Sequence, residues 1–263
     1  INLIREAVDQ GVTFMDNAWE YHRGRSEELM GRALTGGRRQ KVFLMTKHHG
    51  RDQKTAMRHL EDSLRRLRTN VIDLWQFHEV IYDDDPDRIF GPNGGIEAAE
   101  LARRQGKVRF IGFTGHKDPA VFVRMLAHNY PWDAVQMPVN VLDAHFRSFQ
   151  RQILPLLGQR DIGAIAMKSI ASGHLLRTGA VTPAEALAYV WSQPVATLVS
   201  GMPSSRDLRA NVRLAAGFRP LSRKEQDRLL ARTEKIARSG KYEPFKTTRG
   251  YDSREGRHRH DLE

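Results

Sequence analysis

Four side chains that can hold or move a proton lie at the ends of apolar segments early in the chain. Asp16, Lys47 and His78 end or follow three strand-like segments, and Tyr21 lies five residues beyond Asp16. Reduction of a carbonyl group needs an acid, a cation that strengthens this acid, a counter-ion and an orienting hydrogen-bond donor. The four residue types supply these roles and predict a catalytic site.

The same residues suggest how the proton would be moved. A tyrosine with its ordinary pKa of about 10 is a weak proton donor at neutral pH, and Lys47 beside Tyr21 would lower that pKa. Asp16 would compensate the buried charge of Lys47, and His78 would orient the carbonyl oxygen. Singly, each residue has a structural alternative, such as a cap, a solvated lysine or a packed histidine. Their joint occurrence at successive strand ends favours catalysis.

The elements that would position these residues alternate between helices and strands. We predict seven strands, at residues 12–15, 42–45, 72–77, 108–113, 134–139, 163–167 and 195–199. Each follows a helical pattern, at residues 1–10, 26–34, 55–67, 97–105, 119–128, 148–159 and 183–192. This alternation favours a parallel sheet covered by helices, and the near-continuous apolar strands indicate that both sheet faces are buried.

Seven strands are one fewer than a (β/α)8 barrel has, and the missing strand is the one that would precede the helix at residues 1–10. We therefore predict an N-terminally incomplete (β/α)8 TIM barrel over about residues 1–218, and a natural start upstream of Ile1. A C-terminal extra helix and a polar tail would form residues 219–263, and we expect one domain. A doubly wound open sheet is the alternative, but no glycine-rich turn follows an early strand.

Composition limits the partners and the location. The 42 Lys and Arg exceed the 31 Asp and Glu by 11, which could attract nucleic acid, a membrane or a phosphorylated cofactor. No nucleic-acid-binding module is recognisable, and no apolar run approaches the roughly 20 residues of a membrane helix. The chain has no cysteine, which fits a reducing cytoplasm. We expect a cytoplasmic protein without nucleic-acid or membrane partners, no metal site, and a frayed end at residues 257–260; the oligomeric state is not indicated.

Two segments carry a resemblance to a known family. One is residues 11–34, which begin with Gly-Val-Thr-Phe-Met-Asp-Asn-Ala-Trp-Glu-Tyr. This segment resembles the first signature of the aldo-keto reductases, which are NADPH-dependent barrels. Residues 63–78 resemble the central signature, and the similarity spans about residues 1–218. The resemblance implies an oxidoreductase that reduces aldehyde or ketone carbonyls to alcohols. It also implies a catalytic role for four residues, Asp16, Tyr21, Lys47 and His78.

The resemblance further implies a site for NADPH, with NADH as the alternative. Thr114 replaces the hydroxyl that holds the nicotinamide carboxamide, although Gly115 stands where the family has asparagine. Gln136 matches the second carboxamide ligand, Met167 would supply a stacking surface and Lys168 a phosphate contact. The adenosine-phosphate segment, a loop that leads into a helix N-terminus, would contribute Gly201, Ser205, Arg206 and Asn211.

The substrate side is less defined. Trp19 is expected to form an aromatic wall for a small-molecule carbonyl substrate. A second hypothesis is a cofactor-binding regulatory or sensor subunit on the same barrel with little turnover, because one fold hosts many functions.

Overall fold

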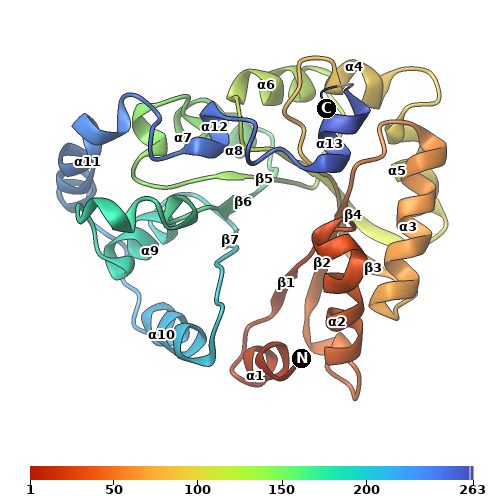
Figure 1. Cartoon of the computed structure of the whole chain (residues 1–263), viewed down its shortest axis with the longest axis horizontal. Coiled ribbons are helices and arrows are strands. Elements are labelled where there is room, and N and C mark those ends of the chain that lie inside the picture. The colour runs from red at the N-terminus through yellow and green to blue at the C-terminus, as the bar shows by residue number, and fades with distance from the viewer. Residues whose placement is uncertain (261, 263) are drawn as a thin grey trace.

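The computed structural model describes residues 1–260 and residue 262. Seven strands form one curled sheet in which every neighbouring pair is parallel and the order follows the chain (Figure 1). The strands are β1 (Phe14–Asp16), β2 (Phe43–His48), β3 (Ile72–Phe77), β4 (Val108–Thr114), β5 (Ala134–Pro138), β6 (Gly163–Met167) and β7 (Thr197–Leu198). This arrangement confirms the predicted incomplete (β/α)8 barrel, with β1 and β7 as the two edges of the sheet.

Helices surround the outside of the curled sheet (Figure 1). Those that alternate with the strands are α1 (Asn2–Asp9), α2 (Arg25–Ala33), α3 (Gln53–Leu67), α5 (Gly95–Arg104), α6 (Pro119–Ala127), α7 (Phe149–Gln152), α8 (Leu154–Gln159), α9 (Pro183–Trp191) and α10 (Ser205–Ala216). Four more are α4 (Asp85–Phe90), α11 (Arg223–Ala237), α12 (Pro244–Thr247) and α13 (Arg254–Arg259). Short 3-10 turns are η1 (Tyr21–Gly24), η2 (Arg39–Lys41), η3 (Asp143–His145), η4 (Ala171–Gly173) and η5 (Leu176–Thr178).

Local chemistry explains where several helices begin and end. Gly11, just after α1, has a φ of +89°, a conformation that glycine adopts without steric cost. The Ser222 hydroxyl and the Glu225 side chain form a reciprocal capping box at the start of α11. The single helix predicted at residues 148–159 is wrong, because it divides into α7 and α8 at Ile153. Pro155 has no amide hydrogen and cannot continue the helical hydrogen bonds across that point.

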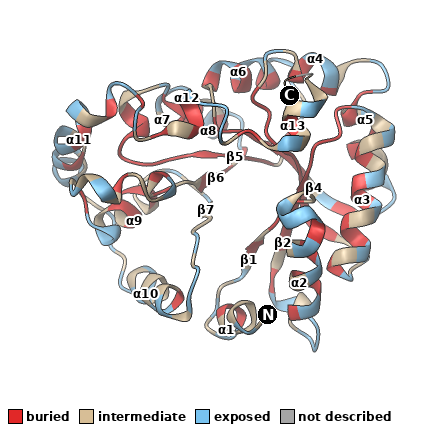
Figure 2. Cartoon of the chain, viewed as in Figure 1, coloured by how far each residue is buried: buried red, intermediate tan, exposed pale blue. Residues whose placement is uncertain are grey.

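The core has an outer and an inner part. The larger apolar cluster lies between the strands and the helices, and all six residues of β3 are buried (Figure 2). A smaller cluster is built around Met45, Leu74, Ala134 and Ile165, with Phe14, Phe43 and Phe110 packed against it. The central strands are therefore covered on both faces, as their near-continuous apolar sequences predict, whereas both residues of the edge strand β7 are partly exposed.

The open side of the sheet is spanned by two helices. In Figure 1, α1 and α10 lie side by side below β1 and β7. Glu6 of α1 accepts a hydrogen bond from the Ser205 hydroxyl at 2.5 Å and pairs with Arg209 at 2.7 Å. A groove of about 740 Å³ lies between the two edge strands and these helices.

The segment of residues 240–260, which we call the tail, is packed against the barrel. It contains α12 and α13 and crosses from α11 toward α4 (Figure 1). The prediction of a frayed end at residues 257–260 is wrong: the His260 side chain is 6% exposed and lies 3.0 Å from Asp84 and 3.2 Å from Asp85. Residues 261 and 263 of the predicted tail lie outside the described residues. Among the helices described, none is both long enough and apolar enough to cross a membrane.

Candidate active site

The four residues predicted to be catalytic come together at the carboxyl ends of the strands. Asp16 is the last residue of β1, Lys47 lies in β2, His78 directly follows β3, and Tyr21 begins η1. All four line one cavity of about 710 Å³. Active sites of parallel barrels lie on this face, because the loops that follow the strands meet there.

Lys47 is held by a carboxylate and a backbone carbonyl. Its ammonium forms an ion pair with Asp16 and donates to the carbonyl oxygen of Asn17 at 2.7 Å. The other Asp16 oxygen accepts a hydrogen bond from Gln136 Nε2 at 3.0 Å. Burial acts to lower the pKa of Lys47, but Asp16 and Tyr21 raise it above its usual value. Lys47 therefore carries its positive charge beside the tyrosine.

Tyr21 faces the cavity with 39% of its surface exposed. The Lys47 ammonium lies 5.0 Å from the centre of its ring, and the His78 ring lies 5.6 Å away at an angle of 76°. Desolvation by the surrounding protein raises the pKa of Tyr21, and Lys47 acts in the opposite direction. The expected lowering by Lys47 is therefore present, but desolvation outweighs it. The phenol stays protonated at neutral pH and can serve as a proton donor.

His78 is a buried ring beside the tyrosine. Its backbone amide donates to the carbonyl oxygen of His48 at 2.8 Å, which continues the pairing of β2 with β3. Burial lowers the pKa of His78 well below its ordinary value, and the nearby His49 and Lys47 lower it further. The imidazole is therefore neutral, and one ring nitrogen carries a proton that it can donate.

Five of the predicted cofactor residues line the same cavity: Thr114, Gln136, Met167, Lys168 and Gly201. The Lys168 ammonium lies 5.0 Å from the ring centre of Phe245, and burial lowers the pKa of this lysine. Gly115 also borders the cavity, and a Cβ atom there would lie 2.3 Å from the carbonyl oxygen of Val80. The backbone therefore leaves no room for an asparagine at this position.

The other three predicted cofactor residues lie on α10, outside that cavity. Asn211 donates to the Ser200 hydroxyl at 3.0 Å and borders the groove between β1 and β7. Ser205 is bonded to Glu6, and Arg206 is exposed. Their cofactor contacts remain predictions.

Trp19, predicted to contact substrate, points toward α3. Its ring stacks on His59 with centroids 3.6 Å apart, and its indole nitrogen donates to Asp62 at 3.2 Å. It borders a separate pocket together with Arg23 and Arg66. The structure therefore does not bring Trp19 into the cavity that Tyr21 lines.

Several polar residues of the site are absent from the sequence predictions. Glu20, Glu79, His116, Tyr251 and Ser253 line the cavity, and His49 lies directly behind it. Glu20, His49 and Glu79 lie within two residues of predicted site residues, so the rule that strand ends carry function could have found them. Ser253 lacks such a signal, because its amide bonds to Glu79 at 3.0 Å across 174 residues of sequence.

Comparison with known proteins identifies the family. Residues 1–185 match the model of the aldo/keto reductase family, so the chain belongs to this family. It is 30% identical over 195 residues to aldo-keto reductase YhdN of Bacillus subtilis (strain 168), covering 69% of this chain and 54% of that protein. It is 27% identical to the uncharacterized oxidoreductase YqkF of the same organism. That match covers 66% of this chain and 57% of YqkF. The chain thus spans little more than half the length of these relatives.

Solved structures support the fold. Aldo-keto reductase AKR11C1 from Bacillus halodurans, in its apo form, superposes with a TM-score of 0.71 at 26% identity, covering 88% of this chain and 85% of that one. An aldo/keto reductase from Klebsiella pneumoniae, solved in complex with NADP and acetate, gives a TM-score of 0.70 at 22% identity. The superposition covers 90% of this chain and 84% of that one.

Proposed function

We propose that this protein reduces an aldehyde or ketone to an alcohol with a nicotinamide cofactor, and that Tyr21 donates the proton. The observation that carries the proposal is the shared cavity of Tyr21, Lys47, Asp16 and His78, in which a carboxylate-bound ammonium lies beside a protonated phenol. Family membership supports the reaction class.

The residues around the cavity suit such a cofactor. Thr114 offers a hydroxyl, Gln136 an amide and Lys168 a cation, and together they can bind the carboxamide and phosphate groups of a nicotinamide nucleotide. When bound, the cofactor supplies the hydride that adds to the carbonyl carbon. The relative that was solved with NADP supports NADPH as the donor.

The chain itself handles the proton and the developing charge. As the carbonyl π electrons move onto oxygen, Tyr21 transfers its phenolic proton to that oxygen and becomes a phenolate. Lys47 stabilises the phenolate through its positive charge, and Asp16 keeps Lys47 charged. His78 donates a hydrogen bond to the carbonyl oxygen and fixes its orientation beside Tyr21.

The tail belongs to this site. Tyr251 and Ser253 line the cavity together with residues of the strands. We therefore extend the proposal to the domain organisation: the barrel and the tail act as one domain, because neither encloses the cavity alone.

Substitution of Tyr21 tests the proposal. Tyr21→Phe should keep nicotinamide binding but reduce turnover by about 10²–10⁴-fold, because general acid catalysis is lost while the ring remains. Cofactor binding is measured by fluorescence and turnover by oxidation of NADPH. Tyr242→Phe, which changes a tyrosine that does not line the cavity, is the matched control and should keep full turnover. Full activity in Tyr21→Phe would refute the proton donor.

A panel of aldehydes, ketones and quinones tests the reaction itself. The parent protein should bind NADPH and reduce at least one of these compounds. If it binds NADPH and reduces none, the regulatory or sensor function on the same barrel replaces our proposal.

A further inference from the structure

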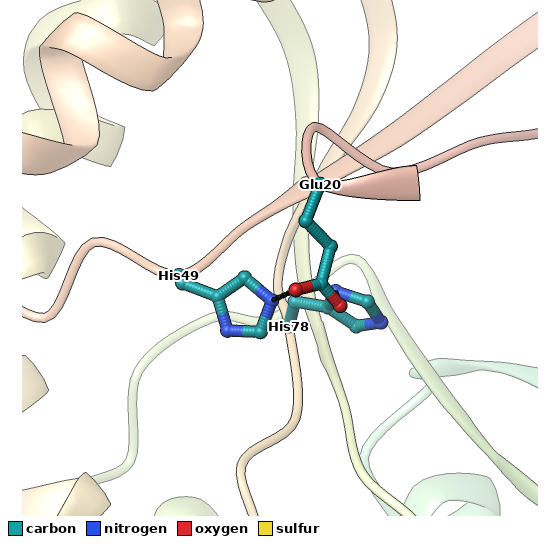
Figure 3. A group of neighbouring side chains, drawn as sticks. All are labelled: Glu20, His49 and His78. Carbon is teal, nitrogen blue, oxygen red and sulfur yellow. Dashed lines mark ion pairs between the residues drawn. The ribbon is translucent and has the colours of Figure 1, made fainter. Parts of the chain in front are cut away.

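Three side chains with metal-binding atoms meet beside the cavity. Glu20 lies between β1 and η1, His49 follows β2 by one residue, and His78 follows β3 (Figure 3). One Glu20 oxygen is 3.2 Å from His49 Nε2, and the other is 3.8 Å from His78 Nδ1. All three ligand atoms lie within 4.8 Å of one another. Three strand ends thus present two imidazoles and one carboxylate to a common point.

The contact between Glu20 and His78 is incomplete. The 3.8 Å separation is too long for a hydrogen bond, and His78 Nδ1 has no hydrogen-bond partner although the residue is 7% exposed. A buried nitrogen without a partner is costly, so the geometry points to a bridging group between the ring and the carboxylate.

The spacing suits a tetrahedral cation. Zinc binds histidine nitrogen and carboxylate oxygen at about 2.0–2.2 Å, which places neighbouring ligand atoms about 3.3 Å apart. The separations from Glu20 are close to this value, 3.2 Å from one oxygen to His49 and 3.8 Å from the other to His78, and all three ligand atoms lie within 4.8 Å. Binding would therefore require the three side chains to rotate toward the ion.

The charges around the cluster also suit a cation. Glu79, a second buried carboxylate, lies close enough to interact with both His49 and Glu20. Among the residues that the structure describes, neither Glu20 nor Glu79 has a lysine or arginine ion-pair partner. Of the cations near the cluster, Lys47 and Arg51 are paired with Asp16 and Asp85. Lys168 has no ion pair among the described residues and interacts with Glu79. Within the described part of the chain, Glu20 is therefore the carboxylate of this cluster whose ion-pair partners are both histidines.

We propose that Glu20, His49 and His78 form a binding site for one divalent transition-metal ion, with zinc the best match to two imidazoles and one carboxylate. Glu20 and His78 line the cavity, so an exogenous ligand can take the fourth coordination position from that side. With the ion on Nδ1, the ring proton of His78 lies on Nε2. The site shares His78 with the proposed hydride-transfer machinery, but binding of the ion does not require that reaction.

Cobalt tests the site by its spectrum. The whole chain, freed of metal with a chelator, is titrated with Co²⁺. One equivalent should produce visible absorption bands of a four-coordinate ion, and Zn²⁺ should displace them. No binding by the parent at millimolar Co²⁺ would overturn the proposal. Because the readout is a spectrum, it does not depend on whether the protein reduces carbonyls.

Single variants assign the ligands. His49→Gln, outside the proposed proton-transfer set, should weaken Co²⁺ binding about a hundredfold or more. Glu20→Gln, at a half-buried loop position, should also weaken it and provides a second variant if the first misfolds. The control, His128→Gln, changes an exposed histidine that stacks on Phe90 and should retain binding. Parent-like binding by both His49→Gln and Glu20→Gln, or loss of binding in His128→Gln, would overturn the proposal.

Discussion

The tail and the segment of residues 200–211, which we call the α10 segment, both border the cavity but are held in different ways. In the tail, the Lys246 ammonium is fully buried and pairs with Asp143 at 2.6 Å and with Glu243 at 3.0 Å. The α10 segment follows β7, an edge strand of two partly exposed residues. Its polar links to α1 are a hydrogen bond from Ser205 to Glu6 and a surface ion pair between Arg209 and Glu6.

This difference shows that the polarity of a segment's sequence does not indicate how firmly the segment is held against the barrel. Both segments contain charged residues, yet the tail is held by charges that are buried and the α10 segment by charges that are partly exposed. Buried pairs are costly to break singly, whereas exposed pairs contribute about 0–1 kcal/mol. Substitutions in the two regions should therefore differ strongly in their effect on stability.

The largest effect should come from Lys246 in the tail. Lys246→Met should lower the free energy of unfolding by about 3–5 kcal/mol, because it leaves Asp143 and Glu243 facing each other without a cation. Urea denaturation monitored by circular dichroism measures it. Lys241→Met, which removes an exposed lysine five residues earlier, should change stability by less than about 0.5 kcal/mol. Equal effects of the two substitutions would contradict the importance of burial.

Asp85, which contacts His260 of the tail, should make the stability of the protein depend on pH. Burial acts to raise the pKa of Asp85, but Arg51 and hydrogen bonds hold it well below its ordinary value of 3.8. The stabilisation is therefore present above about pH 4 and is lost as pH falls below it. At neutral pH, Asp85→Asn should cost about 1.5–3 kcal/mol.

The check is to measure unfolding of the parent and of Asp85→Asn at pH 7 and at pH 3. The difference in stability should be smaller at the lower pH. A difference that stays constant or grows on acidification would show that the Asp85 carboxylate does not provide this stabilisation.

Substitution of Arg206 should have an intermediate effect, and it should change the binding of NADPH more than the binding of NADH. If Arg206 contacts the 2′-phosphate, Arg206→Ala should weaken NADPH binding about tenfold, or ~1.4 kcal/mol, and leave NADH binding nearly unchanged. Fluorescence titration with both cofactors measures this. Arg213→Ala, an exposed arginine farther along α10, is the matched control. An equal loss for NADPH and NADH would remove the assignment of Arg206.

The smallest loss of stability should come from breaking the exposed ion pair between Arg209 of the α10 segment and Glu6 of α1. Arg209 and Glu6 have side chains that are 54% and 27% exposed, so Arg209→Ala should cost about 1 kcal/mol or less. The cost should shrink further in 1 M salt, because salt screens exposed charges. A loss as large as that of Lys246→Met would abolish the contrast between the two regions.

The strands and the four residues near their ends could be predicted from local patterns. Apolar runs fix β3 and β6 at the predicted residues, and parallel pairing brings the residues that follow the strands to one face. Sequence similarity added the cofactor residues, of which those on the central strands line the cavity. The break between α7 and α8 at Ile153 could have been predicted from Pro155, which has no amide hydrogen.

The packing of the tail could not be predicted in the same way. Lys246 meets Asp143 across 103 residues, and Ser253 meets Glu79 across 174. No periodicity within residues 240–260 reflects these partners. For the same reason, the shared position of Glu20, His49 and His78 appears only when three separate strand ends meet in space.

The distance along the chain between Glu79 and Ser253 also has a consequence for biosynthesis. Ribosomes add about 5–20 residues per second, so the 174 intervening residues require roughly 10–35 s. During this time Tyr21, Lys47 and His78 have already been made, but the cavity lacks the wall that the tail provides. Contacts so distant in sequence also form slowly in folding. The nascent chain therefore carries its reactive residues in an unfinished pocket, and closing that pocket is among the last steps of its maturation.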